Sequence, residues 1–129
     1  MLNKIIDILK DFFDVKEYEF LNIKKTLLQF SIDERNYVAE YNKDDDPGFF
    51  RVLLPKIESI DEISIREVKD RMITITSLYK VGKAISINNE VWLSAEVFIS
   101  SESNVLELFT RMLSVLNDMY KKYNEMRNG

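Results

Sequence analysis

The sequence predicts an α+β fold in which a largely antiparallel sheet has helices packed on one face. Two segments near the ends of the chain place apolar residues at helical spacing, i, i+3, i+4 and i+7. Between them, apolar runs with a period of two are separated by short polar turns, which is the pattern of hairpin strands and of an antiparallel sheet. The predicted order is helix, three strands, helix, two strands, helix, in a single domain that spans residues 1–129.

Residues 2–13 are predicted to form the first helix. Charged residues interrupt its apolar positions, so the segment does not match a secretory signal. No stretch approaches the roughly 18 apolar residues of a membrane span, and we expect a soluble, cytoplasmic protein. The segment 14–25 is left without an assignment, although its apolar residues require that part of it packs. The apolar stripe of the first helix consists of Leu2, Ile5, Ile6, Leu9, Phe12 and Phe13.

Three strands are expected between the first and the middle helix. Apolar and polar residues alternate in each, and polar or Pro-Gly turns separate them. Pro55 cannot donate a backbone hydrogen bond, so it indicates a strand end or an edge position. The expected strands are 28–32, 37–42 and 49–54, with turns at 33–36 and 43–48.

The middle helix has the clearest start signal in the chain. Ser64 followed by Glu67 matches a capping box, and Ile63 and Val68 then occupy the two positions of a hydrophobic staple. A start near Ser59 or Asp61 is the alternative. Gly82 is expected to cap the C-terminal end of this helix.

A hairpin and a long helix complete the chain. Asn88-Asn89 suits a type I′ turn, because Asn tolerates the positive φ that both central residues need. Asn104 is expected to be the N-cap of the last helix, with Glu107 at N3. The second hairpin strand directs Val91, Leu93, Ala95, Val97 and Ile99 to the core face, and Trp92, Ser94, Glu96 and Phe98 to the other face.

The composition excludes several classes of site. The chain has no Cys and no His, which removes disulfides, thiolate zinc sites, cysteine nucleophiles and the usual catalytic triads. Its net charge is −4, so it lacks the basic footprint of a protein that binds nucleic acid or an anionic membrane. We expect neither nucleic acid nor a membrane as a partner, and no metal or other cofactor.

Three polar motifs could carry chemistry but fit it poorly. Asp44–Asp46 clusters carboxylates, yet Arg51 follows where a calcium loop needs another acidic ligand. Glu90 and Glu96 lie on one strand at a separation on the order of 20 Å, too far for an acid–base pair. Gly82-Lys83 lacks the several glycines of a phosphate loop. We assign no catalytic residue and do not expect an enzyme.

The aromatic residues of the second sheet face form the candidate site. Trp92 and Phe98 lie opposite the apolar set, so they are exposed if the helices cover only one face. Tyr37 and Tyr41 share a face of their own strand and join them if the register allows. Exposed aromatic residues mark interaction surfaces, which predicts a partner-binding or dimer surface here. The alternative is that a helix or the segment 14–25 packs over these residues.

The run Tyr79–Ile87, followed by Asn88–Leu93, and the order of the elements resemble the YbjN family, whose members are similar in fold to type III secretion chaperones. The resemblance covers residues 5–126. It implies an α+β sandwich, frequent homodimerisation, and binding of other proteins rather than catalysis.

Two functions are consistent with these features. The first is a non-enzymatic, chaperone-like protein-binding module that acts as a homodimer. The alternative is a small-ligand binding or sensing domain with an apolar pocket between sheet and helices, lined by aromatic side chains and by Met72, Met112 and Met119.

Overall fold

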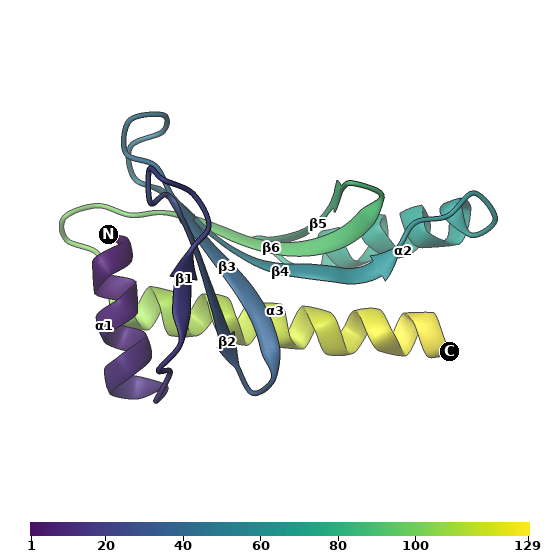
Figure 1. Ribbon diagram of the computed structural model, residues 1–129. Coiled ribbons are helices and arrows are strands. Elements are labelled where there is room, and N and C mark those ends of the chain that lie inside the picture. Colours follow the sequence, from purple (N-terminus) through teal and green to yellow (C-terminus); the bar gives the residue numbers. More distant parts are fainter.

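The computed structural model describes all residues, 1–129, and confirms the predicted fold class. Three helices accompany a six-stranded antiparallel sheet (Figure 1). The segment left without an assignment contains one additional short strand, β1, at the edge of the sheet. The elements are α1 (Leu2–Phe12), β1 (Tyr18–Phe20), β2 (Leu27–Ile32), β3 (Arg35–Tyr41), β4 (Phe49–Ser59), α2 (Ile65–Leu78), β5 (Gly82–Ile87), β6 (Glu90–Phe98) and α3 (Val105–Asn128).

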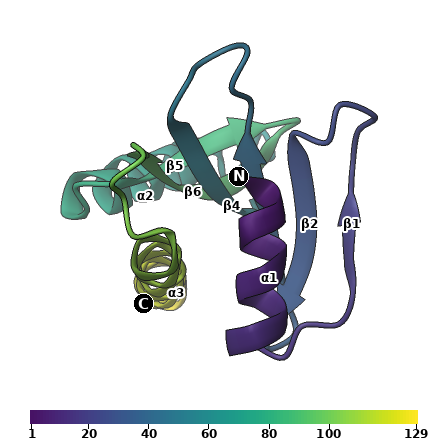
Figure 2. The same cartoon turned by 90° about the vertical axis from the view of Figure 1, so that its left-hand side faces the viewer.

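The sheet is bent into two wings, one formed by β1, β2 and β3 and the other by β4, β6 and β5. The two wings enclose α1 and α3. The strand order of the sheet is β1-β2-β3-β4-β6-β5. Figure 2 shows β4, β6 and β5 above α3, while β2 and β1 descend beside α1. The helices α1 and α3 therefore lie in the angle between the wings and contact each other. The outer side of the sheet carries no helix (Figures 1 and 2).

Helix α2 lies along the edge strand β5 and also contacts α3. The backbone N–H of Ala84, in β5, donates to Oγ1 of Thr76 in α2 at 2.9 Å. A backbone donor at a sheet edge otherwise offers a template for another strand. The helix thus covers this edge, and β1 forms the opposite one.

The hydrophobic core fills the space between the concave side of the sheet and the helices. Val91, Leu93 and Ala95 of β6 are fully buried there, which confirms the predicted core face of that strand. The apolar stripe of α1 is also confirmed at Ile5 and Leu9, whereas Phe12 points into solvent. The largest core side chains from α3 are Phe109, Met112, Leu116, Met119 and Tyr123.

Local signals at the second hairpin and at α3 are confirmed. Asn88 and Asn89 have φ values of 50° and 59°, as a type I′ turn requires. The side-chain oxygen of Asn104 accepts the N–H of Glu107 at 3.1 Å, so Asn104 caps α3. The turn and the cap each depend only on residues close in sequence, so both could be predicted without knowledge of the tertiary contacts.

The start of α2 is placed correctly, but the expected capping mechanism is wrong. Ser64 is the N-cap, yet its side chain makes no capping bond. Instead, the N–H and hydroxyl of Ser64 both donate to Oδ1 of Asp61, at 2.9 and 2.8 Å. Ile63 is 95% exposed, so the hydrophobic staple does not form. The hydroxyl of Ser64 is turned toward Asp61 and away from the first turn of the helix, and the bonds to Asp61 hold the turn before α2.

Pro55 does not end its strand. β4 continues to Ser59 through an irregularity, where three residues lie between Leu54 and Glu58 but only one, Trp92, lies between their partners Leu93 and Val91 on β6. Lys56 has a φ of 55° in this bulge. The pairing of β4 with β3 stops at Leu53, opposite Val38. The two wings of the sheet therefore separate beyond this point.

Gly82 does not cap α2, which ends at Leu78 with an extended residue after it. Gly82 instead begins β5 and is buried beneath α3. A Cβ at this position would overlap Sδ of Met119 and would come within 3.3 Å of Cγ1 of Val115. The absence of a side chain thus permits the close approach of β5 to α3.

We expect Gly82→Ala to destabilise the fold by about 1–3 kcal/mol, because an added methyl group in a filled core forces its neighbours to shift. Urea unfolding measures this change. Ser86→Ala, on an exposed position of the same strand, is the control and is expected to stay within about 0.5 kcal/mol of the parent chain. Equal effects of the two substitutions would contradict the packing role of Gly82.

Candidate functional site

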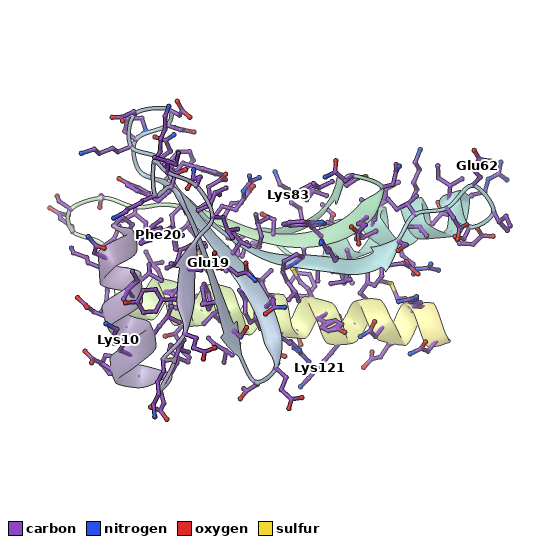
Figure 3. The ribbon with its side chains drawn as sticks, in the orientation of Figure 1. Lys10, Glu19, Phe20, Glu62, Lys83 and Lys121 are labelled. Atoms are coloured by element: carbon purple, nitrogen blue, oxygen red, sulfur yellow. The ribbon has the colours of Figure 1, made fainter.

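The outer side of the sheet, which we call the open face, carries a row of alternating charges across four strands. Nη2 of Arg51 lies 2.6 Å from Oε1 of Glu40, and its Nη1 lies 3.7 Å from Oε2 of Glu96. Nζ of Lys83 is 2.8 Å from the other oxygen of Glu96. The row thus runs negative, positive, negative, positive from β3 to β5. Figure 3 shows Lys83 on the side of the sheet away from α3.

An aromatic pair lies next to this row, at the end of β6. Phe98 is 73% exposed. Its ring packs edge-on against that of Phe49 in β4, with 5.6 Å between the centroids and an interplanar angle of 63°. The pairing register places these two residues directly opposite each other. Phe98 is therefore a large apolar side chain held in place by its neighbour but largely open to solvent.

The predicted aromatic site is only partly assembled by the structure. Trp92 and Phe98 share the open face, and Trp92 is half-buried there. Tyr37 and Tyr41 lie on the helix side, so the prediction that they join the patch is wrong. Tyr37 is 5% exposed and stacks on Phe30 at 5.6 Å within the core. Alternation had shown that the two tyrosines share a face, but only the pairing register decides which face that is.

A cleft of about 480 Å³ opens where the two wings separate. Gln29, Arg35 and Val38 line it from β2 and β3, and Pro55, Lys56 and Trp92 line it from β4 and β6. The guanidinium of Arg35 lies 4.5 Å from the centroid of the Tyr120 ring. One of its nitrogens also donates to Oδ1 of Asn117, in α3. No local pattern in the sequence indicates this cleft, because it forms where two paired strands diverge.

A second polar cluster is buried between β4, α2 and α3. Oε1 of Glu58 accepts the hydroxyl of Tyr123 at 2.5 Å and lies 3.0 Å from Nη2 of Arg71. Nε of Arg127 lies 2.8 Å from the other oxygen of Glu58. The side chain of Glu58 is only 7% exposed. One carboxylate therefore ties two helices to the sheet, and this arrangement supports a structural role.

Tyr123 and Tyr79 have strongly shifted pKa values. Burial, together with the hydrogen bond to Glu58, raises the pKa of Tyr123 to about 12. Burial and the hydrogen bond to Asp118 likewise raise the pKa of Tyr79 to about 12. Both shifts move the phenols further from neutral pH, where a general acid or base works best.

The remaining candidate motifs, namely the acidic run Asp44–Asp46, the glutamates of β6 and the methionines, do not form a catalytic or metal site. Glu96 is neutralised by Lys83 and Arg51 on the open face. Nowhere do three or more acidic side chains lie close enough together to hold a metal ion. Met112 and Met119 belong to the core and do not line the cleft.

No known family model matches this sequence, and comparison with curated proteins gives no significant match. The resemblance to the YbjN family therefore stays a prediction. None of the helices combines the length and the apolar character that crossing a membrane requires.

We expect Glu58→Gln to destabilise the fold by about 3 kcal/mol, because it leaves the guanidinium of Arg71 buried without a carboxylate. Glu107→Gln is the matched control. Glu107 also lies 3.0 Å from an arginine, Arg111, but that pair is exposed on α3 and contributes about 0.5 kcal/mol or less. Urea unfolding of both variants compares the two pairs, and similar losses would show that burial of Glu58 has no energetic consequence.

The raised pKa of Tyr123 makes stability fall at alkaline pH. The folded chain holds the phenolic proton up to about pH 12, whereas an unfolded tyrosine releases it near 10. This stabilisation is complete below pH 10 and is lost as the pH rises through about 12. Tyr123→Phe is therefore expected to show a shallower loss of unfolding free energy from pH 10 to 12. A slope for Tyr123→Phe identical to that of the parent chain would contradict the assignment.

Proposed function

We propose that this chain is a non-enzymatic protein-binding module that acts as a homodimer, and that the open face is the surface through which two copies associate. The observation that carries this proposal is Phe98, a phenylalanine 73% exposed on a sheet face without a helix. Large aromatic residues at the centre of an interface contribute much of the binding energy. Phe49 holds the ring of Phe98 in one orientation, so little side-chain entropy is lost on association.

The charged row of the open face supports a second copy as the occupant. A two-fold axis parallel to the strands, between β4 and β6, would place Arg51 opposite Glu96 of the second copy. The same operation would place Glu40 opposite Lys83 and Phe98 opposite Phe49. A two-fold interface requires a surface that is complementary to itself, and the order negative, positive, negative, positive has this property. These charges are already paired within each chain, so they would orient the two copies more than they would tighten the complex.

The ionisable groups within the fold support a binding role over catalysis. The shifted phenols of Tyr79 and Tyr123 have pKa values of about 12, and each is held by a carboxylate within the fold. Glu58, the most buried carboxylate, is already hydrogen-bonded to Tyr123 and paired with Arg71 and Arg127. The resemblance to the YbjN family, for which homodimers and protein binding are expected, points in the same direction.

The proposal predicts that Phe98→Ser weakens association by about tenfold or more, because it removes a large exposed aromatic ring from the interface. Size exclusion with light scattering over a wide concentration range measures the mass. The parent chain is expected at twice its monomer mass of 15.3 kDa, and the variant at the monomer mass over most of the range.

Phe12→Ser is the matched control for this experiment. Phe12 is 64% exposed, but it lies on α1, away from the open face. It removes the same chemical group from the surface and should leave the dimer intact. A parent chain that stays monomeric throughout, or an equal loss of association in both variants, would refute the proposed interface.

A further inference from the structure

The lining of the cleft between the two wings is positively charged, in contrast to the acidic chain as a whole. Arg35 and Lys56 both contribute to the lining, and no Asp or Glu does, although the chain as a whole carries a net charge of −4. Arg35 is half-buried and makes no ion pair, whereas Arg51, Arg71 and Arg127 each contact a carboxylate. The local potential in the cleft therefore favours an anion.

The indole N–H of Trp92, a residue that lines the cleft, is a hydrogen-bond donor without an acceptor in the protein. Its Nε1 is buried and has no hydrogen-bond partner in the protein. The hydroxyl oxygen of Ser94, two residues further along the same face of β6, is also buried and unpartnered. A buried donor left unpaired costs about 1–3 kcal/mol, and Trp92 lines the cleft, so the resonance of its indole N–H should respond to a ligand bound beside the ring.

The guanidinium of Arg35 is held in position before any ligand arrives. It lies over the Tyr120 ring at 4.5 Å, and Oδ1 of Asn117 accepts one of its hydrogen bonds. A guanidinium fixed in this way loses little freedom on binding, and its planar fork matches the two oxygens of a carboxylate. Val38, Pro55 and Ile57 supply apolar surface in the same cleft.

We propose that this cleft binds a small organic carboxylate with an apolar body. The carboxylate would face Arg35 and Lys56, and the body would lie against the apolar surface beside the Trp92 ring. The volume of about 480 Å³ falls within the range of known small-molecule sites. This function goes beyond the proposed self-association, which depends on Phe98 at the other end of β6.

The test uses three probes with the same phenyl body: 4-phenylbutyrate, its neutral amide 4-phenylbutyramide, and the cation 4-phenylbutylamine. Trp92 is the single tryptophan of the chain, so its indole N–H gives one unambiguous cross-peak in a ¹H–¹⁵N spectrum. We expect 4-phenylbutyrate to move this cross-peak in a saturable way. The amide and the amine should bind about tenfold more weakly or worse, because they lack the charge-assisted bond to Arg35.

Arg35→Gln is expected to reduce the affinity for 4-phenylbutyrate to that of the amide. Arg66→Gln, an exposed arginine of α2 outside the cleft, is the matched control and should leave all three affinities unchanged. If Arg35→Gln fails to fold, Lys56→Gln, at an exposed position of the bulge, should still weaken the carboxylate and not the amide.

Two results would overturn the inference. One is no movement of the Trp92 cross-peak with any probe up to its solubility limit. The other is equal affinity for the carboxylate and the amide in the parent chain. Phe98→Ser separates this test from that of the proposed function, because it should weaken the dimer and leave binding of 4-phenylbutyrate unchanged.

Discussion

The break in β4 between Leu54 and Glu58 is the constraint on which the rest of the structure depends. β4 connects the two wings, since it pairs with β3 on one side and with β6 on the other. The two additional residues in the bulge end its pairing with β3 but preserve its pairing with β6. Because their number is even, Glu58 still points to the helix side, as Leu54 does. The same irregularity thus opens the cleft between the wings and directs the carboxylate of Glu58 toward the helices.

The carboxylate of Glu58 and the small residue Gly82 determine how the helices sit against the sheet. Glu58 connects β4 to Arg71 of α2 and to Tyr123 of α3. Gly82 allows β5 to approach α3 at Met119. These two contacts secure the wing of β4, β6 and β5, which carries Phe98 and three of the four charges of the row. The outer face can therefore present a fixed pattern of charges and aromatic rings without a helix to support it.

Phe98 and the cleft lie at opposite ends of β6 and have different chemistry. Phe98 and the charged row form a broad, electrically balanced surface, which suits a protein partner. Trp92 and Arg35 belong to a concave, cationic cleft, which suits a small anion. Their separation on one strand means that substitutions can distinguish the two activities.

The sequence by itself determined the fold class, the core face of β6, the Asn88-Asn89 turn and the Asn104 cap, because each depends on neighbours along the chain. It also placed Trp92 and Phe98 on the same face of one strand, because residues an even number apart on a strand point to the same side. Only the tertiary structure decided that Tyr37 stacks in the core, that Glu58 meets Tyr123, and that the wings part beside Trp92. These features depend on strand register and on contacts between distant segments, and neither hydrophobic period nor local propensity specifies them.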